Sequence, residues 1–225
     1  RSWDELDHVR EKLRPELEAH LAATGFVALI WGEGGWVQFF TKDPITHPEE
    51  FKRARIFAWS GGILQASVMK SQGYQPVAIP LADILPALET GMIDTVPVAP
   101  LWALIGQFDR ITRHMLRINW VPIVGATVMR RQTFEALRPE TREALLAASN
   151  KATEELRAHR AVQDEESIRA MQKRTLKVTE MTPDLEQEWR AMAERSWPLV
   201  RGTMVPAETF DRVRAILAEY RGAKR

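Results

Sequence analysis

The 225-residue sequence has no cysteine, no excess of either charge and no long apolar run. Without cysteine there is no disulfide, cysteine-ligated zinc, iron–sulfur cluster or thiol nucleophile. The 31 Lys and Arg residues balance 30 Asp and Glu residues, so the net charge of +1 gives no basic excess for nucleic acid or anionic lipid. No apolar run approaches the roughly 20 residues needed to span a bilayer, so we expect no stable insertion into a membrane.

Motifs for catalysis, metals and phosphates are also scarce. The five histidines are scattered, and none has a partner at metal-ligand spacing, so we expect no metal and no cofactor. The glycine-rich segment at residues 32–35 lacks the Lys and Ser/Thr of a phosphate-binding loop and is expected to be a plain turn. Ser60 precedes two glycines but lies outside a G-x-S-x-G motif. The sequence predicts no catalytic residue, with a serine hydrolase built on Ser60 as a remote alternative.

Tryptophan is unusually abundant, with eight Trp against two Tyr. Five of them lie at or just beyond expected strand ends, or on loops: Trp31, Trp36, Trp59, Trp102 and Trp120. Each one alone is compatible with an ordinary core position. Together they predict an aromatic-lined cleft, because α/β proteins bind ligands at the ends of strands.

Expected strands alternate with helices along the chain. Strands are expected at residues 26–30, 55–59, 76–79, 93–96, 114–118 and 124–130, and helices at 60–73, 83–90 and 101–108, with a very long helix from 139 toward 174. This order predicts an α/β class with a mainly parallel sheet. Residues 56–108 hold just four charged side chains and the rest of the chain is charge-rich, which indicates two lobes with the long helix crossing between them.

Four segments resemble, in order, those of a known family. Residues 25–36 (GFVALIWGEGGW) are similar to its strand and loop before the first binding arginine, and residues 42–52 (KDPITHPEEFK) to its K-x-P-I-x-x-P-E-D-L-K crossing. Residues 73–94, with the specific A-L-x-T-G-x-x-D pattern, and residues 134–142 resemble two further motifs. The family is the DctP-type solute-binding proteins of TRAP (tripartite ATP-independent periplasmic) transporters, and the resemblance covers essentially the whole chain.

The resemblance implies a fold and a role. The fold would be the two-lobed periplasmic-binding-protein type, Venus-flytrap-like, with a long lobe-spanning helix and a first lobe that is incomplete here. Lobe I would comprise residues 1–34 and 123–162, and lobe II residues 35–122 and 163–225. The protein would lie in the periplasm after removal of a signal peptide. It would catalyse nothing, capture a small organic solute in an inter-lobe cleft and deliver it to the TRAP permease subunits.

The sequence departs from the family where the solute is usually held. The family's arginine in an L-K-I-R-V strand falls on Phe57, its second arginine falls on Val37, and its asparagine falls within residues 97–99. A buried carboxylate without its cation would cost several kcal/mol. We therefore expect a neutral, largely apolar or aromatic solute.

The candidate ligand-binding residues are Glu33, Trp36, Val37, Arg55, Phe57, Trp59, Pro97, Val98 and Trp120. The solute would stack on Trp36, Phe57 and Trp59, with Trp120 as a further contact. Two alternatives stay open. Strand alternation places Arg55 on the face of Phe57 and Trp59, so it could bind an organic acid. The protein could also be a ligand-sensing lobe that reports to a receptor.

Overall fold

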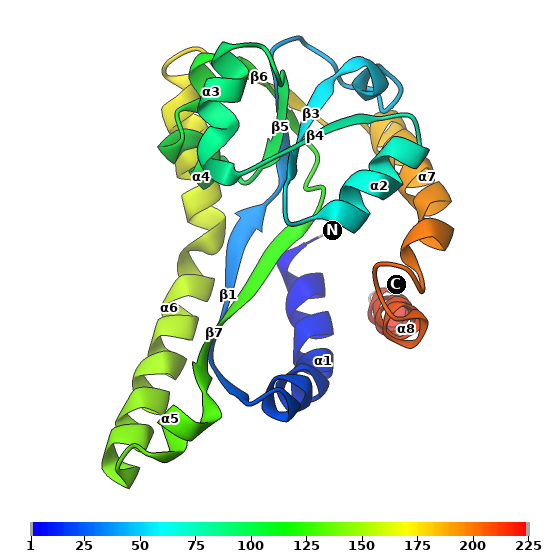
Figure 1. Cartoon of the computed structure of the whole chain (residues 1–225). Coiled ribbons are helices and arrows are strands. Elements are labelled where there is room, and N and C mark those ends of the chain that lie inside the picture. The colour runs from blue at the N-terminus through cyan, green and yellow to red at the C-terminus, as the bar shows by residue number, and fades with distance from the viewer. Residues whose placement is uncertain (1, 224–225) are drawn as a thin grey trace. The chain divides into compact units, whose positions relative to one another are not determined.

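The computed structural model describes residues 2–223, which divide into two compact units. Unit 1 comprises the residues up to Gly35, Pro122–Val162 and the residues from Asp211 onward. Unit 2 comprises Trp36–Val121 and Gln163–Phe210. The elements of both units are labelled in Figure 1. Within residues 2–223, no helix is long and apolar enough to cross a membrane.

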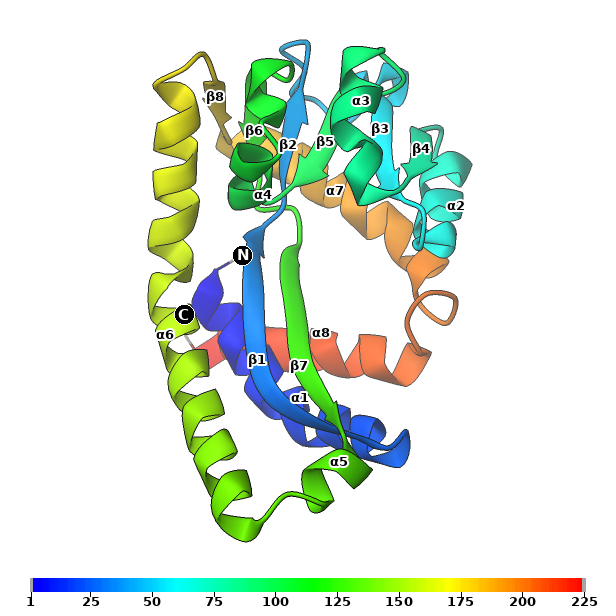
Figure 2. The ribbon, with the colours of Figure 1, turned by 60° about the vertical axis from the view of Figure 1, so that its left-hand side comes forward.

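Unit 1 is built from helices and a two-stranded sheet. Its elements are α1 (Trp3–Ala23), β1 (Phe26–Trp36), β7 (Pro122–Arg130), α5 (Arg131–Glu135), the first part of α6 (Pro139–Gln172) and most of α8 (Ala207–Ala223). The start of α1 was predictable from its capping pattern, since Ser2 Oγ accepts a hydrogen bond from Glu5 N at 3.2 Å. Figure 2 shows β1 and β7 side by side, and they pair with each other alone.

The prediction of a plain turn at residues 32–35 is wrong, because β1 continues through these residues to Trp36. Three glycines in this stretch weaken the local signal for a strand. Pairing with β7 supplies the backbone hydrogen bonds, which do not depend on side chains.

Unit 2 is organised around a six-stranded sheet in the order β4-β3-β5-β2-β6-β8. The strands are β2 (Gln38–Thr41), β3 (Arg55–Trp59), β4 (Gln75–Ile79), β5 (Thr95–Val98), β6 (His114–Arg117) and β8 (Lys177–Glu180). Strand β3 is parallel to β4 and β5, and β6 is parallel to β8. Strand β2, which the sequence did not predict, is antiparallel to both of its neighbours, so the sheet is mixed.

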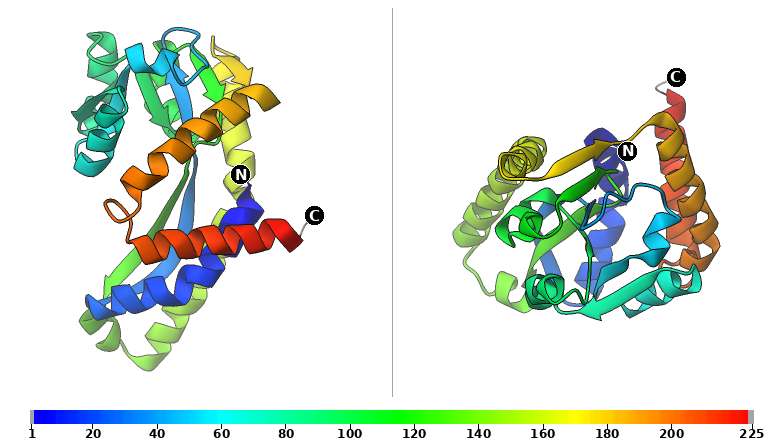
Figure 3. Two further views of the ribbon diagram at one scale, coloured as in Figure 1. Left: turned by 90° about the vertical axis from the view of Figure 1, so that its right-hand side faces the viewer. Right: turned by 90° about the horizontal axis from the view of Figure 1, so that it is seen from above.

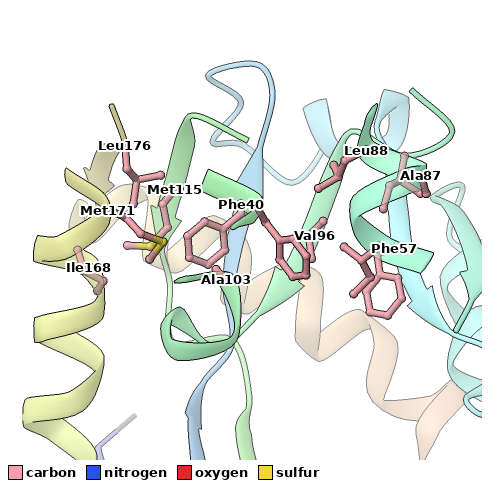
Figure 4. Close-up of a cluster of buried hydrophobic side chains, with 13 residues drawn as sticks. Phe40, Phe57, Ala87, Leu88, Val96, Ala103, Met115, Ile168, Met171 and Leu176 are labelled. Carbon is pink, nitrogen blue, oxygen red and sulfur yellow. The ribbon is translucent and has the colours of Figure 1, made fainter. Parts of the chain in front are cut away.

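Both faces of this sheet are covered. One face packs against α3 (Ile84–Glu89), α4 (Pro100–Ile105) and the last part of α6, and the other against α7 (Pro183–Val200) and the 3₁₀ turn Glu50–Arg53. Successive strand residues alternate between the two cores, so Phe40 and Phe57 join the first, whereas Phe39 and Ile56 join the second. Figure 4 shows the first core. Helix α2 (Ile63–Ser71) connects β3 to β4.

The observed units differ from the expected lobes at the end of the chain. Residues from Asp211 onward group with unit 1, whereas the sequence analysis assigned residues 163–225 together. The reason is a set of contacts between α8 and α1, which Figure 3 shows next to each other. Arg221 Nε donates to Glu5 Oε1 at 2.6 Å, and Arg212 pairs with Glu16. The ring of Tyr220 packs against the ring of His8.

Candidate functional site

The carboxyl ends of β3, β4 and β5 lie along one edge of the unit 2 sheet. The parallel pairing aligns Trp59 with Ile79 and Ile56 with Thr95, so the three strands end together. We call this the carboxyl edge, and define it as residues 59–64, 79–81 and 98–105. In open sheets with parallel strands, ligands bind outside this end of the strands.

Large apolar side chains are exposed at the carboxyl edge. Trp59 is 57% exposed, Trp102 is 52% exposed and Ile63 is 76% exposed. The other exposed apolar side chains there are Leu64, Leu81 and Ile105. Residues 56–69, 76–82 and 95–108, which lead into and out of the edge, contain no Asp, Glu, Lys, Arg or His. A concentration of exposed apolar surface without charge is typical of a binding site for an apolar ligand.

Apart from the Ser60 hydroxyl and the two indole N–H groups, the polar groups of the carboxyl edge are backbone groups. After β3 the chain turns, with Ser60 N donating to Ile79 O at 3.1 Å and Gly62 N donating to Trp59 O at 2.8 Å. Helix α2 then starts at Ile63, three residues later than the sequence predicts, because residues 60–62 form this turn. Among residues 2–223, no side chain caps α2, so N–H groups of its first turn are left for water or for a neutral ligand oxygen.

The structure places Phe57 and Arg55 away from the exposed surface of this edge. Phe57 is 7% exposed and packs in the core beside Ala87 (Figure 4). Arg55 lies at the opposite, amino end of β3, where its Nε donates to Asp94 Oδ2 at 2.9 Å. Its backbone N also donates to Asp94 Oδ1 at 2.9 Å. The guanidinium that would bind an organic acid therefore already has a carboxylate partner.

Backbone hydrogen bonds join the start of β2 to the segment that follows β6, and the candidate residues Trp36, Val37 and Trp120 lie at this junction. Val37 N donates to Val121 O, and Trp120 N donates to Val37 O, both at 2.9 Å. Trp36 and Val37 are buried, and Trp120 packs edge-on against Trp189 with ring centroids 5.6 Å apart. These residues lie in packed surroundings within unit 2.

The side chain of Asp164, on α6, binds the backbone of Trp36, just before β2. Its Oδ2 accepts a hydrogen bond from Trp36 N at 3.3 Å. Burial raises the pKa of Asp164, and the bond from Trp36 and the charge of Arg117 oppose that rise.

The remaining candidates are Pro97, Val98 and Glu33. Pro97 and Val98 belong to β5, are half-buried and pair with β2. Glu33 lies in unit 1, where its carboxylate is in contact with the guanidinium groups of Arg10 and Arg160.

Among the exposed apolar residues of the carboxyl edge, the sequence predicts Trp59 alone as a ligand contact. Trp102 is one of the five tryptophans that predict an aromatic-lined cleft, but it is not among the candidate contacts. The signal that could have found it is position, because Trp102, Ile63 and Leu81 all follow the end of a strand within segments that lack charge.

A depression in unit 2 lies at the edge of the sheet opposite the carboxyl edge. It has a volume of about 370 Å³ and is lined by Thr41, Asp43, Ile45, Glu49, Glu50, Arg53, Ala54, Asp94 and Thr95. Three of its carboxylates already have partners in the chain. Asp94 pairs with Arg55, Glu49 pairs with Lys52, and Glu50 accepts from Thr46 N and His47 N. In the part of the chain that the structure describes, no group of acidic and histidine side chains is arranged to hold a metal ion.

Comparison with known proteins gives the family. The sequence profile of the family described as bacterial extracellular solute-binding protein, family 7, matches residues 5–201. The C4-dicarboxylate-binding periplasmic protein DctP of Rhodobacter capsulatus is 23% identical over 212 residues, covering 90% of this chain and 61% of that protein. The 2,3-diketo-L-gulonate-binding periplasmic protein YiaO of Escherichia coli is 25% identical over 148 residues, covering 63% and 43%. The chain thus spans less than two thirds of the length of these relatives.

Solved structures share the fold. The periplasmic ectoine-binding protein of the TeaABC TRAP transporter of Halomonas elongata superimposes with a TM-score of 0.85 at 20% identity, covering 97% of this chain and 73% of that one. The pyroglutamic acid receptor DctP7 of Bordetella pertussis gives 0.84 at 19% identity, covering 96% and 71%. The expected α/β fold of the two-lobed type and the periplasmic location are confirmed, and the family's proteins are receptors and not enzymes. The chain belongs to family 7 of the bacterial extracellular solute-binding proteins, the DctP family.

Proposed function

We propose that this protein binds a small, neutral and largely apolar organic solute at the carboxyl edge of unit 2 and delivers it to the permease subunits of a TRAP transporter. The observation that carries the proposal is the exposure of Trp59 and Trp102 on an edge whose segments contain no charged side chain. Each exposed indole provides a large apolar contact surface. Backbone N–H groups at the start of α2 supply the hydrogen-bond donors that a neutral oxygen needs.

The charge distribution disfavours an organic acid at this edge. The names of several similar proteins specify acids, among them a C4-dicarboxylate, a diketogulonate and pyroglutamic acid. In this chain Phe57 and Val37 occupy the positions where the family resemblance places arginine, and both are buried. A carboxylate moved from water to an uncompensated apolar site would lose several kcal/mol of hydration free energy.

The test is a ligand screen of the full chain by thermal shift and tryptophan fluorescence. The panel contains neutral aromatic and alicyclic compounds, and the acids succinate, galacturonate and pyroglutamate. A ligand at 100 times its Kd should stabilise the fold by about 2.7 kcal/mol. We expect neutral compounds alone to respond, and Trp59→Ala and Trp102→Ala each to raise Kd about tenfold.

Two control variants make the screen decisive. Met92→Ala removes an exposed apolar side chain of unit 2 that lies outside the carboxyl edge, and it should leave Kd unchanged. Arg55→Ala should also leave Kd unchanged, because Arg55 pairs with Asp94 at the other end of β3. If the acids respond and Arg55→Ala abolishes their binding, the neutral-solute proposal is wrong. Delivery is tested by solute uptake into vesicles that carry the TRAP permease, with and without this protein.

A further inference from the structure

The indole of Trp59 lies directly over the backbone of Gly61. A Cβ atom placed on Gly61 would lie 2.6 Å from Cη2 and from Cζ2 of the indole, and 2.9 Å from Cε2. Real Cβ atoms essentially never approach other heavy atoms that closely. Glycine at position 61 is therefore a condition for the observed position of the ring.

The backbone that carries this indole is fixed on both sides. Trp59 is the last residue of β3 and pairs with Ile79 of β4. Its carbonyl accepts a hydrogen bond from Gly62 N, and Ser60 N donates to Ile79 O. The turn therefore holds one face of the indole against bare backbone, while the residue remains 57% exposed. An exposed ring that rests on a fixed support is already arranged for binding before a solute arrives.

We propose that Trp59, supported by Gly61, is a preformed stacking platform that selects solutes with a planar, unsaturated ring. This inference rests on the proposed function, since it names which neutral solutes the carboxyl edge prefers. A rigid flat surface loses little conformational entropy when a ligand stacks on it. Stacking between two π-systems adds to the burial of apolar area, and a saturated ring of the same size lacks that addition. Gly61 acts through Trp59 and is a positioning residue.

The absence of charge narrows the chemical class further. A cation could also lie over an indole face. Residues 56–69, 76–82 and 95–108 offer no carboxylate to balance its charge, which favours an uncharged ring. A response to a quaternary ammonium compound in place of the neutral ring would contradict this part of the proposal.

The platform itself is tested without ligand by comparing Gly61→Ala with Gly125→Ala. Gly125 lies on β7, outside the carboxyl edge, and a Cβ atom placed on it would meet no heavy atom of the described chain within 4 Å other than its sequence neighbours. The ¹H–¹⁵N resonance of the Trp59 indole, assigned with Trp59→Phe, reports the position of the ring. We expect Gly61→Ala to shift this resonance and to increase acrylamide quenching, and Gly125→Ala to change neither. An unchanged indole in a folded Gly61→Ala variant would overturn the platform.

Selection is tested with two neutral probes, benzyl alcohol and cyclohexylmethanol. They share the hydroxymethyl group and ring size and differ in the planarity of the ring. We expect the wild type to bind benzyl alcohol about three to ten times more tightly, and Gly61→Ala to bring the ratio of the two Kd values near one. Gly125→Ala should keep the wild-type ratio. Trp59→Leu, which keeps an apolar side chain but removes the planar ring, should also bring the ratio of the two Kd values near one. This variant provides the test if Gly61→Ala does not fold.

The outcomes separate this inference from the proposed function. Equal binding of the two alcohols by the wild type would overturn the platform and leave a receptor for neutral solutes standing. A ratio that survives in both Gly61→Ala and Trp59→Leu would overturn the platform in the same way. Binding of carboxylates with no response to any neutral compound would overturn both.

Discussion

The buried charges of unit 1 allow a sharp test of the role of Glu33. The sequence predicts Glu33 as a ligand contact, whereas in the structure its side chain is 2% exposed between the side chains of Arg10 and Arg160, which are 4% and 8% exposed. The distance from Arg160 Nη1 to Glu33 Oε1 is 3.2 Å. We predict that Glu33→Gln destabilises the fold, because it leaves two buried guanidinium groups with less compensating charge.

The magnitude follows from the partners that remain. Removal of one member of a buried ion pair costs about 3–5 kcal/mol. Asp7 would still accept from both Arg160 nitrogens, at 2.9 and 2.7 Å, and from Arg10 at 3.1 Å, so we expect the lower end of this range. Burial, followed by the charge of Arg157, lowers the pKa of Arg10, so the site already disfavours another uncompensated positive charge. A loss of about 3 kcal/mol would lower Tm by roughly 6–12 °C.

Urea unfolding of the wild type and of Glu33→Gln measures this loss directly. The matched control is Glu155→Gln, which removes an exposed carboxylate 3.9 Å from Lys151 and should change stability by less than about 0.5 kcal/mol. The double variant Arg10→Met/Glu33→Leu replaces the ion pair with apolar side chains and should recover much of the loss. If Glu33→Gln is as stable as the control but binds the solute more weakly, Glu33 is a ligand contact and the structural role assigned here is wrong.

Three further predictions concern stability. Glu5→Gln should lower the free energy of unfolding by roughly 1–2 kcal/mol at pH 7, because the hydrogen bond from Arg221 lowers the pKa of Glu5 to about 2. The wild type loses this stabilisation as pH falls from about 4.5 through about 2, so in urea unfolding across that range the free energy of unfolding should vary less with pH in the variant. Trp189→Phe should cost about 1 kcal/mol, since its indole N–H donates to Thr46 O at 2.8 Å, and a cost near zero would mean that this bond adds nothing. Phe57→Ala should cost about 3–5 kcal/mol in thermal unfolding without weakening solute binding, and unchanged stability with weaker binding would return Phe57 to the ligand site.

Helices with local start signals were predictable from the sequence. The Ser2 and Glu5 pair marks the beginning of α1, and the long helix that starts at Pro139 ends at Gln172, close to the expected end. Strands β3 to β5 also follow the prediction, because each is a short apolar run between turn residues. These signals act over a few neighbouring residues, so a single sequence carries them.

Strand β2 shows where such signals end. Its four residues, Gln38–Thr41, are all buried, because the strand lies inside the sheet between β5 and β6. Neither partner adjoins it in sequence, and the antiparallel direction depends on where those partners lie. The extension of β1 through three glycines likewise depends on β7. Pairing partners distant in the sequence decide both features, and local propensity does not encode them.

Two residues that the sequence proposes together as solute contacts, Trp59 and Phe57, lie in different surroundings. Trp59 was expected at a strand end; it is the last residue of β3 and is 57% exposed. Phe57 was foreseen as a neighbour on the same face, and alternation does place it there. The depth of the core below α3 then buries it, a property of the packed unit that a pattern of period two does not contain.

The shortage of charge in residues 56–108 has two physical causes, and they apply to different residues. Most apolar residues in this segment fill the two cores of the unit 2 sheet, and burial accounts for them. Burial does not account for Trp59, Ile63 or Trp102, because more than half of each is exposed. Exposed apolar area costs about 25 cal/mol per Å² relative to the same area buried. A solute that covers these side chains would recover that free energy, so their exposure at the carboxyl edge is a reason to look for a ligand that is itself apolar.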